Sequence, residues 1–251
     1  MSVPRGLVEG PIYLDYNATT PIDPAVTDAM RPYLSTAFGN PSSDHHYGHE
    51  PQAALDRARD QVATLIGATG GQIVFTGSGS EADNLAIRGP VLAAGRDRPH
   101  VITQRTEHPA VLRACEALRR WHGTEVTYLP VDGDGLVDPV ALAEAITPRT
   151  VLVSIMAANN ETGALQPIAD LARIAHEHGA LFHSDAAQTI GKLPFDVTAV
   201  DVDLLTVVGH KMYAPKGIAA LYIRPGVRLE PLVYGGGQEH GLRAGTENVA
   251  L

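Results

Sequence analysis

The strongest constraint on the fold of this chain is an alternation of short apolar runs with segments of helical period. Seven runs, many of them β-branched, recur at residues 73–75, 101–103, 126–129, 151–156, 181–183, 204–208 and 220–223. Strands that lack polar alternation and are separated by helices form mainly parallel sheets with both faces covered. The sequence therefore predicts an α/β fold, with a mainly parallel seven-stranded sheet covered by helices on both faces.

Apolar stripes with helical spacing lie between many of these runs, at residues 55–66, 111–118 and 168–175. Gly67 and Gly179 follow two of the stripes as stop signals. The first fifty residues differ, because they are rich in Pro, Gly, Asn and Ser. We expect an irregular N-terminal arm over 1–50 and one large α/β domain over 51–251.

Composition and charge narrow the class of function. The formal charge of −9 leaves no basic face for a nucleic acid, and no basic run or 18-residue apolar run indicates a membrane. A single cysteine excludes an intramolecular disulfide framework. The first ten residues lack the charged and apolar regions of a signal peptide. We therefore expect a cytoplasmic protein.

A glycine-rich turn at 76–81 follows the first apolar run and leads into a helix-prone segment. The N–H groups at a helix N-terminus, together with the positive end of its dipole, suit a phosphate. The alternative is a simple capped helix start, with Ser78 or Ser80 as the cap. The turn is not a P-loop, because no Gly-Lys-Ser/Thr follows it.

Other polar groups follow other predicted strands, and ligands bind at the carboxyl ends of strands in such sheets. Asp185 is placed to hold a heterocyclic nitrogen protonated, or else caps the following turn. His108 is placed to stack on a flat cofactor, or else begins a helix. Asn159 follows the run at 151–156 and is otherwise part of a turn. The histidines at 45–49 predict no metal site, because no Cys or paired acid completes a tetrahedral set.

Lys211 follows the run at 204–208 and is the preferred amine nucleophile, although Lys192 and Lys216 have similar formal claims. Its strand would carry it to the same edge as the phosphate turn, the acid and the histidine. This combination is what a pyridoxal phosphate site needs.

The motifs of the chain, in their order, resemble those of the cysteine desulfurases, which are fold type I pyridoxal phosphate enzymes of the class V aminotransferase group. The resemblance covers nearly the whole chain, and it is carried by YLDYNATT at 13–20, GNPSS at 39–43, TEHPAV at 106–111, NNETG at 159–163, HSDAAQ at 183–188, GHK at 209–211 and GGGQE at 235–239. It implies conversion of L-cysteine to L-alanine, with the sulfur passed on as a persulfide to an acceptor protein for iron–sulfur cluster biogenesis.

The resemblance also implies roles for single residues. Lys211 would form the Schiff base with pyridoxal 5'-phosphate and move the substrate α-proton, Asp185 would pair with the pyridine nitrogen, and His108 would stack on the ring. The other contacts would be Asn159 and Gln188 at the phenolic oxygen, Gly79, Ser80 and His210 at the phosphate, Thr246 of the partner subunit at the phosphate of a homodimer with shared sites, and Asn40 at the substrate carboxylate.

This chain departs from the family pattern at three places. Ser80 replaces the usual Thr and keeps the hydroxyl, whereas Val208 replaces a Ser and removes one phosphate hydrogen bond, worth about 1 kcal/mol. The chain ends at Leu251, before the family's C-terminal segment with its nucleophilic cysteine and carboxylate-binding arginine. We expect that the C-terminal small domain is missing.

The single cysteine, Cys115, lies on the apolar stripe at 111–118, so we expect a buried core residue and not a displaced nucleophile. Two alternatives to a desulfurase stay open. One is a related pyridoxal phosphate lyase acting on cysteine or selenocysteine without an enzyme thiol. The other is a non-catalytic scaffold with the same fold.

Overall fold

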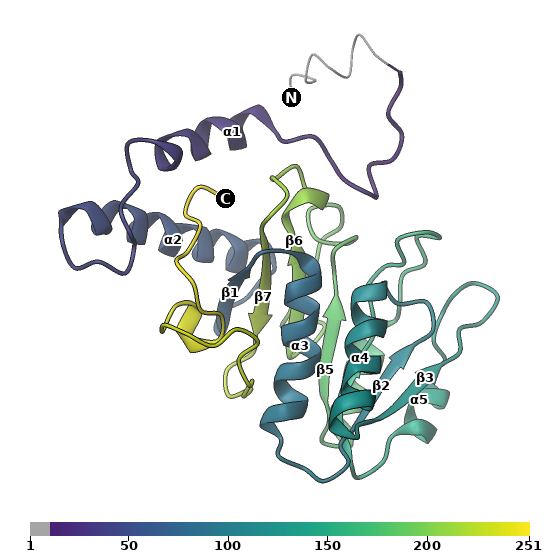
Figure 1. The fold of residues 1–251 in the computed structure, drawn as a ribbon. Helices are drawn as coiled ribbons and strands as arrows, with labels where there is room; N and C mark the ends of the chain where they lie inside the picture. The colour runs from purple at the N-terminus through teal and green to yellow at the C-terminus, as the bar shows by residue number, and fades with distance from the viewer. Residues whose placement is uncertain (1–10) are drawn as a thin grey trace.

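A single seven-stranded sheet forms the centre of the protein in a computed structural model that describes residues 11–251 (Figure 1). The strands are β1 (Gln72–Thr76), β2 (His100–Gln104), β3 (Glu125–Leu129), β4 (Thr150–Ser154), β5 (Leu181–Asp185), β6 (Leu204–Val208) and β7 (Ala219–Ile223). They lie in the order β1-β7-β6-β5-β4-β2-β3, and only β7 runs antiparallel to its neighbours, β1 and β6. Every predicted strand is present, and the predicted fold class is confirmed.

Helices cover both faces of the sheet. They are α1 (Pro24–Met30), α2 (His46–Leu65), α3 (Gly79–Ala93), α4 (Pro109–His122), α5 (Pro139–Ala145) and α6 (Ile168–Glu177), with short 3-10 turns at Arg31–Leu34, Gly209–Lys211 and Glu239–Gly241. The apolar faces of α3 and α4 pack on one side of the sheet, while α5, α6 and the end of α2 pack on the other. Each face thereby has its own hydrophobic core, which keeps both sides of the strands out of water.

Local signals set the ends of the helices. The Ser78 hydroxyl caps α3 by accepting the amide proton of Glu81 at 3.1 Å. Gly67 follows α2 with a φ of 68°, a left-handed conformation that glycine adopts without steric cost. Both features are visible in the sequence because they depend on residues close to one another along the chain.

The segment before α2 is mostly exposed, but it is not entirely irregular as expected. It contains α1, because Asp23 caps this Pro-initiated helix by accepting the amide proton of Ala25 at 2.8 Å. In addition, α2 already begins at His46. The arm is tied to the loop after β6, since the Thr20 amide donates to the His210 carbonyl at 2.9 Å. The division into an arm over 1–50 and a domain over 51–251 stays a prediction, and residues 1–10 lie outside the described residues.

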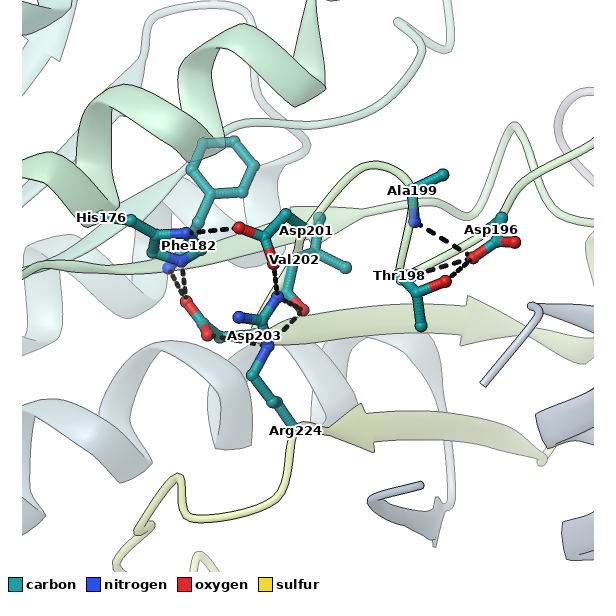
Figure 2. A network of polar contacts seen from close by, with 9 residues as sticks. All are labelled: His176, Phe182, Asp196, Thr198, Ala199, Asp201, Val202, Asp203 and Arg224. Carbon is teal, nitrogen blue, oxygen red and sulfur yellow. Dashed lines mark hydrogen bonds and ion pairs between the residues drawn. The ribbon is translucent and has the colours of Figure 1, made fainter. Parts of the chain in front are cut away.

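The buried acid Asp203, just before β6, links three strands through hydrogen bonds and an ion pair (Figure 2). Asp203 accepts hydrogen bonds from the Phe182 amide and from the His176 ring, both at 2.7 Å, and pairs with Arg224 at 3.2 Å. These partners belong to β5, to α6 and to the residue after β7. The network therefore holds the edge of the sheet opposite the carboxyl ends of β5 and β6.

The C-terminal segment runs beside α2 and β1 (Figure 1). The buried Glu239 carboxylate accepts two hydrogen bonds from Arg59 on α2, at 2.6 and 2.8 Å, and one from the Phe75 amide of β1 at 2.8 Å. The glycine-rich motif at 235–239 is thus anchored on α2 and β1 by its last residue. Within the described part of the chain, no helix combines the length and apolarity needed to cross a membrane.

Candidate active site

A cleft with a volume of about 610 Å³ opens at the carboxyl ends of the parallel strands. The loops after β1, β2, β4, β5 and β6 all contribute to its wall. Seven of the predicted site residues line it: Gly79, Ser80, His108, Asp185, Gln188, His210 and Lys211. The convergence expected from their positions after successive strands is therefore present.

One end of the cleft is the N-terminus of α3. The first N–H groups of a helix have no intrahelical partner, so those of Gly79 and Ser80 are free to bind an anion where the positive end of the helix dipole lies. The His210 ring adds a further group, with Nδ1 3.2 Å from the Thr19 hydroxyl and Nε2 left for a ligand. Because Ser78 caps the same helix, the capping and anion-binding interpretations hold together.

The side chain of Val208 packs directly against Gly79. A Cβ at this position would lie 2.6 Å from Cγ2 of Val208, closer than two carbon atoms approach. Val208 therefore gives the cleft an apolar wall beside the N-terminus of α3, and it restricts position 79 to glycine.

Asp185 ends β5 at the floor of the cleft and is almost fully buried. One carboxylate oxygen, Oδ1, accepts the Ala187 amide proton at 2.9 Å, which leaves Oδ2 for a partner in the cleft. Burial raises the pKa of this carboxyl, while the Ala187 hydrogen bond and the charges of His108 and Lys211 oppose the rise. The geometry suits an acid that holds a proton on a ring nitrogen.

Two further acids beside Asp185 are features that sequence reasoning missed. Asp83 on α3 and Glu107 before α4 are both buried. Glu107 accepts the Met156 amide proton at 2.6 Å, whereas Asp83 Oδ1 and Glu107 Oε2 have no hydrogen-bond partner among residues 11–251. Burial, reinforced by the charge of Asp185, raises the pKa of both carboxyls well above the ordinary range. The available signal was the position of Asp83, three residues after Ser80 on the same helix face.

His108 both begins α4 and lines the cleft. Its Nδ1 accepts the Ala110 amide proton at 3.1 Å, so in the neutral ring the proton is on Nε2. The helix cap thereby fixes the ring at the cleft wall, as a stacking group requires.

Lys211 lies on the 3-10 turn after β6 and donates to the main-chain carbonyl of Asn17. Burial lowers the pKa of its amine, and the nearby Asp185 and Asp15 charges oppose this. A lowered pKa increases the fraction of neutral amine, which is the nucleophilic form. Lys216 is exposed on the following loop and is not part of the cleft wall, which removes one of the alternatives.

Three predicted site residues lie away from the cleft wall. The Asn159 side chain is used in its own loop, where it donates to the Thr106 carbonyl at 3.0 Å and accepts from the Glu161 amide at 2.9 Å. Asn40 is exposed, and Thr246 lines a separate apolar cavity beside α2. The predicted roles of Asn40 toward substrate and of Thr246 toward a partner subunit's site stay predictions.

Cys115 lies on the inner face of α4 and is fully buried, as expected. Burial raises the pKa of its thiol to about 12. A buried thiol with this pKa is neither ionised nor accessible at neutral pH, so Cys115 is a packing residue.

Comparison with known proteins agrees with this site. A profile of the aminotransferase class-V family matches residues 12–251, and the chain therefore belongs to that family. Within it, the chain is 50% identical over 239 residues to the cysteine desulfurase IscS of Dictyoglomus turgidum, covering 95% of this chain and 60% of the relative. It is 52% identical to the mitochondrial cysteine desulfurase of Drosophila melanogaster, covering 94% of this chain and 52% of the relative. These relatives confirm the resemblance to cysteine desulfurases that the motifs indicated.

The fold is also similar to that of a solved structure described as SspA in complex with cysteine. The TM-score is 0.92 at 43% sequence identity, with 95% of this chain and 69% of that chain covered. The present chain thus spans between half and about two thirds of the length of each of these three proteins.

Proposed function

We propose that this chain binds pyridoxal 5'-phosphate through Lys211 and forms the cofactor-binding part of a cysteine desulfurase acting on L-cysteine. The observation that carries the proposal is the convergence in one cleft of a free helix N-terminus, a buried acid with one unpaired oxygen, a ring fixed by a helix cap and an amine of lowered pKa. The family to which the chain belongs depends on this cofactor, and these residues match its phosphate, its ring nitrogen, its flat ring and its aldehyde in turn.

When bound, pyridoxal phosphate supplies an electron sink for negative charge at the substrate α-carbon. The residues of the chain then have separate tasks. Gly79 and Ser80 hold the phosphate with N–H groups and a hydroxyl, Asp185 holds the proton on the pyridine nitrogen, and His108 keeps the ring flat against the cleft wall. Lys211, as a neutral amine, would move the proton at the α-carbon.

The surroundings of the three buried acids, Asp83, Glu107 and Asp185, favour the ionised form of Asp185 alone. Asp185 accepts the Ala187 amide proton and lies near the charges of His108 and Lys211, all of which favour its ionised form. Asp83 and Glu107 are disfavoured as anions by burial and by the charge of Asp185. Neighbouring carboxyls with separated pKa values allow one to be an anion while the others stay neutral.

The sulfur-accepting half of the reaction needs a thiol from outside residues 1–251, because the only cysteine in them is the buried Cys115. The persulfide, the acceptor protein, the homodimer with Thr246 of the partner subunit at the phosphate and the cytoplasmic location stay predictions. The similarity to a solved protein that was captured in complex with cysteine supports L-cysteine as the substrate.

The test is to load the purified protein with pyridoxal phosphate, reduce it with borohydride and map the modified peptide. We expect an absorbance band at about 420 nm and the label on Lys211. Lys211→Ala should lose the band, whereas Lys216→Ala, which removes an exposed lysine of the same loop, should keep it. A band that persists in Lys211→Ala, or a label on another lysine, would refute the assigned role.

Incubation of the loaded protein with L-cysteine separates the open alternatives. Alanine together with a persulfide on the cysteine of an added acceptor protein, whose thiol takes the sulfur atom, supports a desulfurase. Alanine formed without any protein thiol, with the sulfur released as elemental sulfur or, when added dithiothreitol supplies two electrons, as sulfide, indicates a lyase. A wild-type protein that shows no cofactor band would indicate the non-catalytic scaffold.

A further inference from the structure

Lysine is rare in this chain, and two of its three lysines lie in or next to the cleft. Only three lysines, at positions 192, 211 and 216, stand among 19 Lys and Arg residues, so arginine is the usual cation of the sequence. Lys192 lies next to the cleft, with its Nζ 2.6 Å from Oε1 of Gln188 and 3.3 Å from Oδ1 of Asn17. The tasks proposed above give Lys192 no role.

A tight turn after β5 places Lys192 behind Gln188. The Ile190 amide donates to the Ala186 carbonyl at 3.0 Å, which gives the turn a helical pitch and puts residues 188 and 192 on one side. Gly191, with a φ of 80°, packs so closely on Met212 that a Cβ would lie 2.8 Å from the Met212 Cβ. The turn is therefore seated directly against the residue that follows Lys211.

The contact with Lys192 decides which way the Gln188 amide points. An ammonium group has donors and no acceptor, so the amide must turn its oxygen toward Lys192 and its NH₂ away from it. In that orientation, Gln188 Nε2 donates to the Asn17 carbonyl oxygen at 2.9 Å, the same oxygen that accepts from Lys211 Nζ. The NH₂ of Gln188 and the amine of Lys211 thus converge on one acceptor oxygen.

We propose that Lys192 is a positioning residue: it holds the Gln188 amide with its NH₂ toward the Asn17 carbonyl and the Lys211 amine, where the phenolic oxygen of pyridoxal phosphate would bind. This inference rests on the proposed function. Without Lys192, the amide is held only by the Asn17 carbonyl, which Lys211 also uses as its acceptor. It then rotates more readily by half a turn and presents its own oxygen to an anionic phenolic oxygen, which is repulsive. Lys192 thereby keeps the Gln188 NH₂ oriented as a hydrogen-bond donor.

The simpler alternative is that Lys192 is an ordinary exposed side chain that touches the residue four positions earlier. The test that separates the two compares Lys192→Met with Lys216→Met, which removes an exposed lysine outside the cleft wall. Two quantities are measured on the protein loaded with pyridoxal phosphate: the dissociation constant of the cofactor, and the pH midpoint at which its absorbance band changes.

In Lys192→Met, we expect the midpoint to rise by about 0.5 to 1 pH unit, because a donor that stabilises the phenolate is lost. Cofactor binding should weaken by about threefold to tenfold. Lys216→Met should match the wild type in both quantities. A midpoint in Lys192→Met equal to that of Lys216→Met would overturn the proposal.

A double-mutant cycle with Gln188→Ala tests whether Lys192 acts through the amide. If it does, adding Lys192→Met to Gln188→Ala shifts the midpoint no further than Gln188→Ala alone. Additive shifts would mean that Lys192 acts by itself, which also overturns the proposal. Failure of the proposed function gives a different result. The wild type would then show no cofactor band, which would refute both cofactor binding and the role of Lys192.

Discussion

Replacing Asp203 with alanine should destabilise the fold strongly and leave the cleft intact. The substitution removes the acceptor for the buried Phe182 amide, a loss of about 1–3 kcal/mol. The side chains of His176 and Arg224 are 25% and 30% exposed, so water solvates them and each adds less than about 1 kcal/mol. Together these losses predict a decrease of about 2–4 kcal/mol in the free energy of unfolding, or roughly 4–16 °C in Tm.

The assay is urea unfolding followed by circular dichroism, with cofactor binding measured in parallel. Asp170→Ala is the matched control, because this acid forms only an exposed ion pair, with its oxygen 3.9 Å from Arg173, and should change stability by less than about 0.5 kcal/mol. Since Asp203 lies at the edge of the sheet opposite the cleft, the folded variant should bind pyridoxal phosphate as the wild type does. An Asp203→Ala variant as stable as Asp170→Ala would refute the argument that this network holds the strands.

Three other substitutions test separate parts of the structure. Val208→Ser should restore a hydroxyl at the phosphate and tighten cofactor binding by about fivefold in equilibrium dialysis; unchanged or weaker binding would contradict this. Burial lowers the pKa of His183 to about 3, so the unfolded chain binds a proton between that value and the ordinary pKa near about 6.5, and stability falls as the pH drops through this window. Between pH 6.5 and pH 5 the wild type should therefore lose about 1.6 kcal/mol more in urea unfolding than His183→Gln, and parallel losses would refute the assignment. Gly191→Ala should destabilise more than Gly123→Ala, because both have a positive φ but only Gly191 meets a neighbour, Met212; equal Tm values would show that the close contact is not rigid.

The sequence by itself determined the elements and much of the site. The seven strands follow from apolar runs, and the ends of α2 and α3 follow from Gly67 and Ser78, because periodicity, capping and left-handed turns depend on neighbours in the chain. Residues such as Asp185 and Lys211 were predictable for the same reason. Asp185 ends β5 and Lys211 lies in the turn after β6, and parallel strands bring their carboxyl ends to one edge.

Only the tertiary structure decided what depends on contacts between distant segments. The antiparallel placement of β7, the burial of Asp83 and Glu107 beside Asp185, and the restriction of position 79 by Val208 come from packing that no local pattern encodes. The same holds for Lys192, which sequence reasoning weighed only as a rival to Lys211. Its role emerges because the fold brings the turn after β5 against Asn17, which lies 175 residues earlier in the chain than Lys192.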